Sequence, residues 1–100
     1  MHHNGGMKEE HRAALFAAIS DRTRLRLLSF LLDEEHCVTQ CTQEIGLTQG
    51  AVSKHLARLS ASGLVSRRPT GRRAYYRVVD PEAVQTLLAH ADALIGSTEG

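Results

Sequence analysis

The stretch "LTQGAVSKHLARLSASGLVSRRPTGRRAYYRV", from Leu47 to Val78, carries the strongest signal in this chain of 100 residues. It holds seven of the twelve Lys and Arg residues and none of the eleven Asp and Glu residues. The rest of the sequence has five basic and eleven acidic side chains, so the net charge of +1 conceals two regions of opposite sign. A cationic region without acids favours a polyanionic partner.

This stretch divides into a helix and a hairpin. Thr48 is a typical N-cap residue, and the apolar spacing after it predicts a helix over residues 49–62. Gly63 is expected to end the helix, because glycine readily adopts the left-handed conformation. The runs "LVSRR" and "AYYRVV" then predict two strands. Between them we expect a type I turn with Pro69 in its second position and Gly71 in its fourth.

The sequence on either side predicts four further helices. Residues 11–20 and 22–32 form the first two, and residues 37–45 the third, after a polar break at residues 33–36. Ser20 and Asp21 are suited to cap the second helix, whose inward face is expected to carry Leu25, Leu28 and Leu32. Asp80 and Pro81 begin the last helix as N-cap and first helical residue.

Four helices, a hairpin and a final helix predict a mostly α protein with a small β-hairpin, in the order α-α-α-α-β-β-α of a winged helix-turn-helix. We expect a flexible N-terminus over residues 1–10, one domain over residues 11–96 and a tail over residues 97–100. No apolar run approaches the roughly 20 residues that span a bilayer, and the N-terminus lacks the apolar core of an export signal. These features predict a cytoplasmic protein with reduced cysteines and no membrane partner.

The two central helices suit the reading of duplex DNA. The second helix of such a pair fits the major groove, where its N-terminal side chains meet base edges, and the arginine-rich hairpin can lie on the backbone. The candidate DNA-binding residues are Thr48, Gln49, Gly50, Ser53, Lys54, His55, Arg58, Arg67, Arg68, Arg72, Arg73 and Tyr75. For His55 we favour packing and hydrogen bonding, with DNA contact second.

Other functions remain open alternatives at this point. A winged helix can bind protein instead of DNA, and its binding would then show little dependence on salt. An enzyme is disfavoured, because the neighbouring pairs His36-Cys37 and Ser53-x-His55 have no acid positioned to orient them.

The stretch from about Ala13 to Ile95 resembles the ArsR/SmtB family of winged-helix repressors. "ISDRTRLRLLSFL" is similar to the family's opening helix pair, with Arg22 where proline is usual. "GLTQGAVSKHLARLSASGLV" and "GRRAYYRV" are similar to its recognition helix and second wing strand. The resemblance implies a homodimeric repressor that binds operator DNA and releases it when an effector binds, often a metal ion.

A homodimer is also favoured by the last helix, whose apolar stripe is too long for one small domain to cover. Paired helices would place two recognition helices on one face of DNA, which predicts an inverted-repeat operator. The candidate interface residues are Leu15, Val84, Leu87, Leu88, Ala91, Leu94 and Ile95.

The resemblance gives two places to look for a metal effector. The family's site on the last helix needs ligands where this chain has Ala93 and Gly96, so a sensor of that type is disfavoured. The family's Cys-Val-Cys pattern is matched only at Cys37, with Thr39 in the second position. Cys37 and Cys41 remain candidates for a soft metal or metalloid ion or for thiol oxidation, and an inert Cys41 in the core is the alternative.

Overall fold

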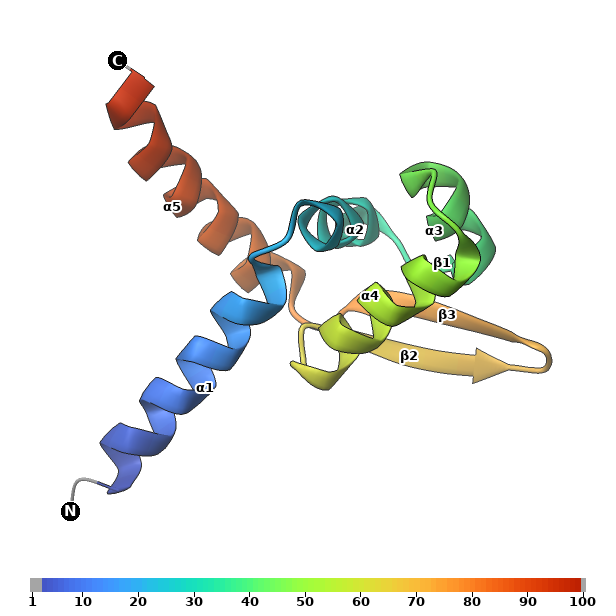
Figure 1. The fold of residues 1–100 in the computed structure, drawn as a ribbon, viewed down its shortest axis with the longest axis horizontal. Helices are drawn as coiled ribbons and strands as arrows, with labels where there is room; N and C mark the ends of the chain where they lie inside the picture. The colour runs from blue at the N-terminus through green and yellow to red at the C-terminus, as the bar shows by residue number, and fades with distance from the viewer. Residues whose placement is uncertain (1–2, 100) are drawn as a thin grey trace.

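A computed structural model describes residues 3–99 of the chain, with side chains placed for residues 7–96. Five helices and three short strands follow one another along it (Figure 1). They are α1 (His3–Ile19), α2 (Arg22–Asp33), β1 (His36–Cys37), α3 (Val38–Ile45), α4 (Gln49–Ala61), β2 (Val65–Thr70), β3 (Arg73–Val78) and α5 (Pro81–Glu99). Within this range no helix is both long and apolar enough to cross a membrane.

Side-chain caps fix where three of the helices begin, as the sequence predicts. The Asp21 carboxylate accepts a hydrogen bond from the Arg24 amide at the start of α2, at 3.0 Å. The Thr48 hydroxyl accepts from the Ala51 amide at the start of α4, at 3.2 Å. The Asp80 carboxylate accepts from the Ala83 amide at the start of α5, at 3.1 Å. Each cap satisfies an amide that the helix itself leaves without a partner.

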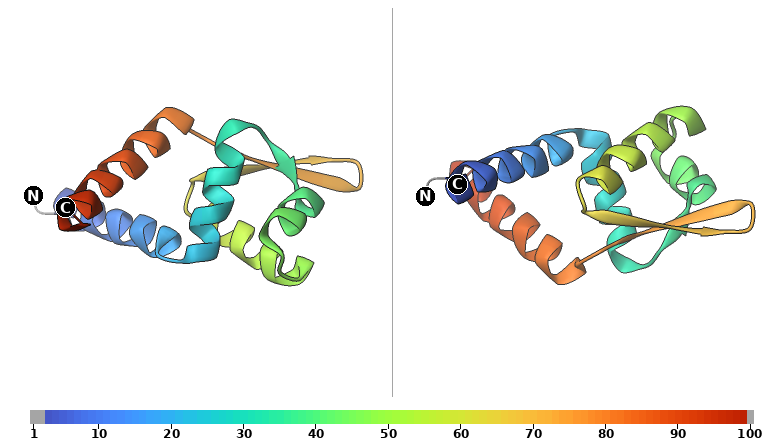
Figure 2. Two further views of the ribbon diagram at one scale, coloured as in Figure 1. Left: turned by 90° about the horizontal axis from the view of Figure 1, so that it is seen from above. Right: turned by 90° about the horizontal axis from the view of Figure 1, so that it is seen from below.

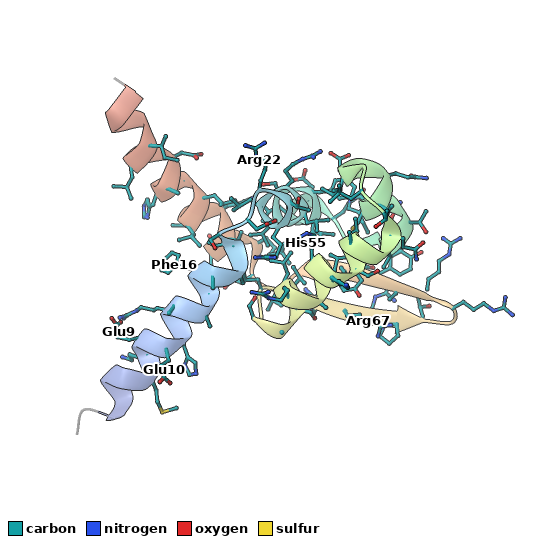
Figure 3. The ribbon with its side chains drawn as sticks, viewed as in Figure 1. Glu9, Glu10, Phe16, Arg22, His55 and Arg67 are labelled. Atoms are coloured by element: carbon teal, nitrogen blue, oxygen red, sulfur yellow. The ribbon has the colours of Figure 1, made fainter. Side chains whose placement is uncertain are left out.

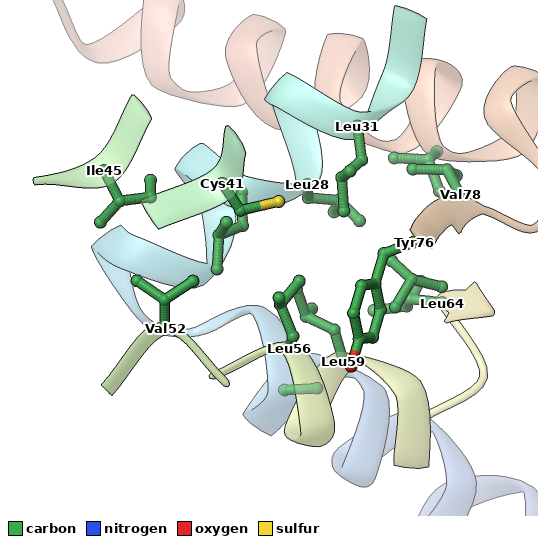
Figure 4. Close-up of a cluster of buried hydrophobic side chains, with 14 residues drawn as sticks. Leu28, Leu31, Cys41, Ile45, Val52, Leu56, Leu59, Leu64, Tyr76 and Val78 are labelled. Atoms are coloured by element: carbon green, nitrogen blue, oxygen red, sulfur yellow. The ribbon is translucent and has the colours of Figure 1, made fainter. Parts of the chain in front are cut away.

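The hydrophobic core lies where α2, α3, α4 and the hairpin meet (Figure 4). Val52, Leu56 and Leu59 of α4 are fully buried in it, as their spacing predicts. Cys41 lies in the same core with no exposed surface.

The inward face of α2 differs from the predicted one. Leu28 is buried, but its core neighbours are Leu27 and Leu31, while Leu25 and Leu32 are only partly buried. The buried stripe starts at Arg24, which follows the i, i+3, i+4, i+7 spacing of a helical face. The sequence analysis considered only apolar residues, so it did not recognise the buried face that begins with the charged Arg24.

The first and last helices form two arms that extend from the core on the same side of the molecule (Figures 1 and 2). Helix α1 begins at His3, eight residues before the predicted start, and α5 continues to Glu99, past the predicted limit at residue 96. Lys8, Glu9 and Glu10 are good helix formers that need no buried face, so propensity favours extension of the helix through these residues, but it does not account for the turn that contains Gly5 and Gly6.

The sheet contains one strand that the sequence did not predict. Its order is β1-β3-β2, and the two-residue strand β1 pairs with β3, placing His36 opposite Tyr76. Residues 33–36 were expected to be only a polar break, because two residues are too few to show a strand pattern. Tertiary pairing with β3 makes His36 and Cys37 a strand, although Cys37 was expected to begin the third helix.

The predicted type I turn at the hairpin tip is wrong. Pro69 lies within β2, opposite Ala74, and the loop is Gly71-Arg72 alone. Gly71 has a φ of 62°, which suits the first loop position of a type II′ turn. Proline is tolerated in β2 because this is an edge strand of the sheet.

Candidate nucleic-acid interface

Helices α3 and α4 form a helix-turn-helix joined by three residues. Gly46 ends α3 in the left-handed conformation, with a φ of 84°, and its amide donates to the Thr42 carbonyl at 2.9 Å. Thr48 then caps α4, so that Gln49 and Gly50 lie exposed in its first turn. A Cβ atom at Gly50 would meet nothing within 4 Å, so packing inside the chain does not require glycine there.

A cleft of about 330 Å³ separates α4 from the hairpin. Side chains of α4 line one side of this cleft, and arginines of β2 and of the hairpin tip line the other. Figure 3 shows Arg67 on the hairpin beside α4. Its lining residues are Cys37, Val38, Thr39, Gln49, Ser53, Arg67, Pro69, Gly71, Arg72, Arg73, Ala74 and Tyr76. The structure therefore brings five of the predicted DNA-binding residues together: Gln49, Ser53, Arg67, Arg72 and Arg73.

Arg68 and Tyr75 lie on the opposite face of the hairpin. They pair with each other across β2 and β3, and the Arg68 guanidinium lies 5.2 Å from the centre of the Tyr75 ring. Arg68 also binds the carboxylate of Glu35 through two nitrogens. The hydrogen bond from Arg68 holds the pKa of Glu35 below its ordinary value, although desolvation acts against this. Two of the predicted DNA-binding residues, Arg68 and Tyr75, are therefore not part of the cleft.

His55 and Arg58 also lie outside the cleft. His55 is turned toward the interior, where its Nδ1 atom is 3.1 Å from Nη1 of Arg24, and its side chain is 24% exposed. Packing and hydrogen bonding, the role favoured from the sequence, fit this position. Arg58 borders a separate groove between α1 and α4. Lys54 is exposed on α4 without being part of the cleft lining.

Arg24 is the residue that the sequence analysis missed. It is only 9% exposed and contacts α1 and α4 from its position on α2. Its place in the stripe with Leu27, Leu28 and Leu31 was the available signal, since a charged residue at a core position is rare unless it is paired.

The two cysteines differ from their predicted arrangement. The predicted helix over residues 37–45 contains both, but Cys37 lies in β1 and is the N-cap residue before α3, where its amide donates to Oε1 of Gln40. Both thiols are free and buried, and Cys37 is only 5% exposed. Burial, and to a lesser degree the nearby Cys37, raises the pKa of Cys41 to about 11. Among residues 7–96, no three His, Cys, Asp or Glu side chains form a group that could hold a metal ion.

The predicted dimer residues lie on the two arms, with different degrees of burial. Val84 is 5% exposed and belongs to the core, while Leu15 and Leu88 pack against the core from its edge. Leu94 and Ile95 are 74% and 56% exposed. Near the bases of the arms is an apolar groove of about 400 Å³, lined by Arg12, Leu15, Phe16, Gly63, Leu64, Val79, Asp80, Ala83, Val84 and Leu87.

A helix-turn-helix followed directly by a β-hairpin defines this chain as a winged helix-turn-helix protein. Residues 21–67 match the family described as bacterial regulatory protein, arsR family. The chain belongs to this family, which consists of regulators and not of enzymes.

Two relatives and one solved structure illustrate the likeness. The chain is 38% identical over 76 residues to a probable mercury resistance operon repressor of Streptomyces lividans, covering 76% of this chain and 61% of that protein. It is 37% identical over 81 residues to the HTH-type transcriptional regulator CmtR of Mycobacterium bovis, covering 81% and 69%. A homodimeric winged helix-turn-helix DNA-binding domain from Mycobacterium bovis superposes with a TM-score of 0.84 at 26% identity, covering 98% and 90%.

Proposed function

We propose that the chain is a homodimeric transcriptional repressor that binds an inverted-repeat operator. Helix α4 enters the major groove, and the hairpin follows the adjacent backbone. The cleft between α4 and the hairpin carries the proposal, because it combines Gln49 and Ser53 with Arg67, Arg72 and Arg73 in a segment without acids. Amide and hydroxyl groups read base edges, and arginines bind phosphate or guanine.

The exposure of Gly50 supports close approach of this helix to the DNA. No neighbouring atom of the chain would clash with a side chain at this position, and its φ is not in the left-handed region. A glycine that neither packing nor backbone geometry requires is well placed where α4 has to lie deep in the groove.

The two arms supply the dimer interface. Phe16 on α1 (Figure 3) and Val79 after β3 are 54% and 49% exposed, and both line the apolar groove at the base of the arms. Large apolar groups gathered around a groove favour burial by a second copy. The homodimeric domain from Mycobacterium bovis supports the same assembly.

Binding of duplex DNA at several salt concentrations tests the proposal. If about six phosphates are neutralised, the logarithm of affinity falls with the logarithm of salt at a slope near −5. Gln49→Ala should lower affinity for the operator but not for random duplex, whereas Arg72→Ala should weaken both. Arg22→Ala, an exposed arginine on α2, is the matched control for loss of charge. A response that hardly changes with salt would favour a protein-binding winged helix instead.

Release by a soft metal ion at Cys37 and Cys41 stays a prediction. The name of the Streptomyces relative, a mercury resistance operon repressor, supports it. Burial of both thiols opposes it, because metal binding requires the thiolate form and access from solvent. Hg²⁺ added to the DNA complex, with Cys37→Ser as the comparison, tests this effector. Release that is equal in the wild type and the variant would remove Cys37 from any sensing role.

A further inference from the structure

Arg24 caps the C-terminal end of α1, the first arm, by donating hydrogen bonds to its last carbonyl groups. Its Nε atom donates to the Ala18 carbonyl at 2.5 Å and its Nη2 atom to the Ala17 carbonyl at 3.3 Å. Both carbonyls lie in the last turn of α1, where helix geometry leaves few amide partners for the oxygens, and the Ala17 carbonyl also accepts long hydrogen bonds from the amide and hydroxyl of Ser20. A cation is also favoured at this end of a helix. Arg24 therefore attaches α1 to α2 with directed, charge-assisted bonds.

The same guanidinium extends to the recognition helix. Its Nη1 atom lies 3.1 Å from Nδ1 of His55, on the interior side of α4 (Figure 3). Arginine can only donate, so Nδ1 of His55 accepts this hydrogen bond in the tautomer that carries its proton on Nε2. The Asp21 carboxylate, 3.8 Å from Nδ1 of His55, completes the polar cluster. Arg24 is buried and the guanidinium is planar and rigid, so its hydrogen bonds fix α1 and α4 relative to each other.

Side-chain packing between α1 and α4 is weaker next to this link. A groove of about 340 Å³ separates the two helices there, lined by Ala14, Ala17, Ala18, Arg58, Ala61 and Ser62. Most of these side chains are short, so they leave open space instead of interlocking. The angle between the arm and the recognition helix therefore depends on the hydrogen bonds of Arg24 together with the packing of Leu15, Ala18 and Ile19 against the core.

We infer that Arg24 and His55 are positioning residues that set the distance between the two recognition helices, and hence the half-site spacing that the dimer accepts. The inference rests on the proposed function, in which α1 and α5 hold the two copies together. A fixed arm and a fixed arm-to-helix angle define where each α4 meets the DNA. Neither residue needs to touch a base, because selectivity for spacing arises from geometry alone.

The test uses the full chain and duplexes that the wild type selects from a randomised pool. The selected repeat is compared with versions whose spacer is one or two base pairs longer or shorter, and with a single half-site. One base pair shifts a half-site along and around the helix, so wild-type affinity should fall about tenfold per added or removed pair. If the wild type selects no inverted repeat from the pool, the proposed function is wrong, and the inference that rests on it is wrong as well.

His55→Leu removes the acceptor, and His55→Asn keeps an oxygen near the Nδ1 position. The Leu variant should bind all spacers within about threefold of one another, while its affinity for the single half-site and its dimerisation match the wild type. The Asn variant should restore discrimination. Loss of half-site affinity in the Leu variant, or a spacer profile like that of the wild type, overturns the inference.

Arg24→Met provides an independent arm of the test, because Arg24 is buried and cannot itself contact DNA. Its spacer profile should match that of His55→Leu, and the double variant should be no flatter than either single one. Additive effects would show that the two residues act separately and would overturn the inference. If Arg24→Met does not fold, the two His55 variants still decide the question.

Discussion

The guanidinium of Arg68 binds both carboxylate oxygens of Glu35, with Nη2 2.5 Å from Oε1 and Nε 3.2 Å from Oε2. Glu35 lies outside the acid-free segment, but the pairing of β1 with β3 brings it beside the hairpin. The outer face of the hairpin is therefore partly neutralised. The cleft face, which carries Arg67, has no acidic residue in its lining. The arginines of the hairpin are therefore divided between a face that is partly neutralised by Glu35 and a cleft face that has no acidic residue.

Releasing Arg68 from this ion pair should strengthen DNA binding. Glu35→Gln removes the carboxylate and leaves the guanidinium available to phosphate, so the salt slope should steepen by about one. Glu34→Gln changes the same net charge on the neighbouring residue and serves as the control. Fluorescence anisotropy with a random duplex measures both. Equal slopes in the two variants would contradict a specific masking of Arg68 by Glu35.

Acid should weaken the folded state partly through Glu35 and Asp21. The hydrogen bond from Arg68 lowers the pKa of Glu35, and that from the Arg24 amide lowers the pKa of Asp21. A lowered folded-state pKa contributes stability above the ordinary values of 4.5 and 3.8, and this is lost as pH falls through the folded values. Urea unfolding between pH 6 and 3 measures it. The double variant Glu35→Gln, Asp21→Asn should show a shallower loss than the wild type.

Alkaline pH should destabilise the protein through Cys41. Its pKa is about 11 in the folded state against an ordinary 9.0, so the unfolded chain loses the thiol proton first as pH rises. Stability is retained below pH 9 and decreases between pH 9 and 11, by about 1 kcal/mol at pH 10. Urea unfolding under reducing conditions should show this decrease. Cys41→Ala should have a smaller decrease over the same range, and an equal one would argue against a buried thiol.

A charge on the apolar groove should separate the proposed dimer. Phe16→Glu places a carboxylate where the second copy is expected to pack, at a cost of about 3 kcal/mol or roughly a hundredfold in dissociation constant. Sedimentation at micromolar concentration should detect monomers. Leu47→Glu is the control, since Leu47 is 44% exposed but lies between α3 and α4, away from the arms. An unchanged dimer in Phe16→Glu would place the interface elsewhere.

Local signals explain most of the successful predictions about the fold. Asp21, Thr48 and Asp80 cap the helices that they were expected to cap, because an N-cap acts within three residues of itself. The hairpin was predicted correctly for the same kind of reason, but the predicted type of its turn was wrong. Pro69 favours a type I turn locally, but pairing of β2 with β3 as far as Thr70 and Arg73 leaves only a two-residue loop.

The candidate site was predicted less completely. Gln49, Ser53 and the cleft arginines follow from the order of helix and hairpin, which the sequence contains. Arg68 has the same charge and a neighbouring position, but alternation along β2 points it to the other face.

The sequence by itself determined the helix-turn-helix, the hairpin and the concentration of positive charge, because caps, periodicity and composition are properties of contiguous residues. Tertiary structure alone decided that Arg24 joins α1 to His55, that Glu35 binds Arg68 and that Cys37 leaves the helix of Cys41. Arg24 and His55 are separated by 31 residues, and Glu35 and Arg68 by 33. Contacts at such separations form only when the core has brought the helices and the sheet together, so no local pattern encodes them.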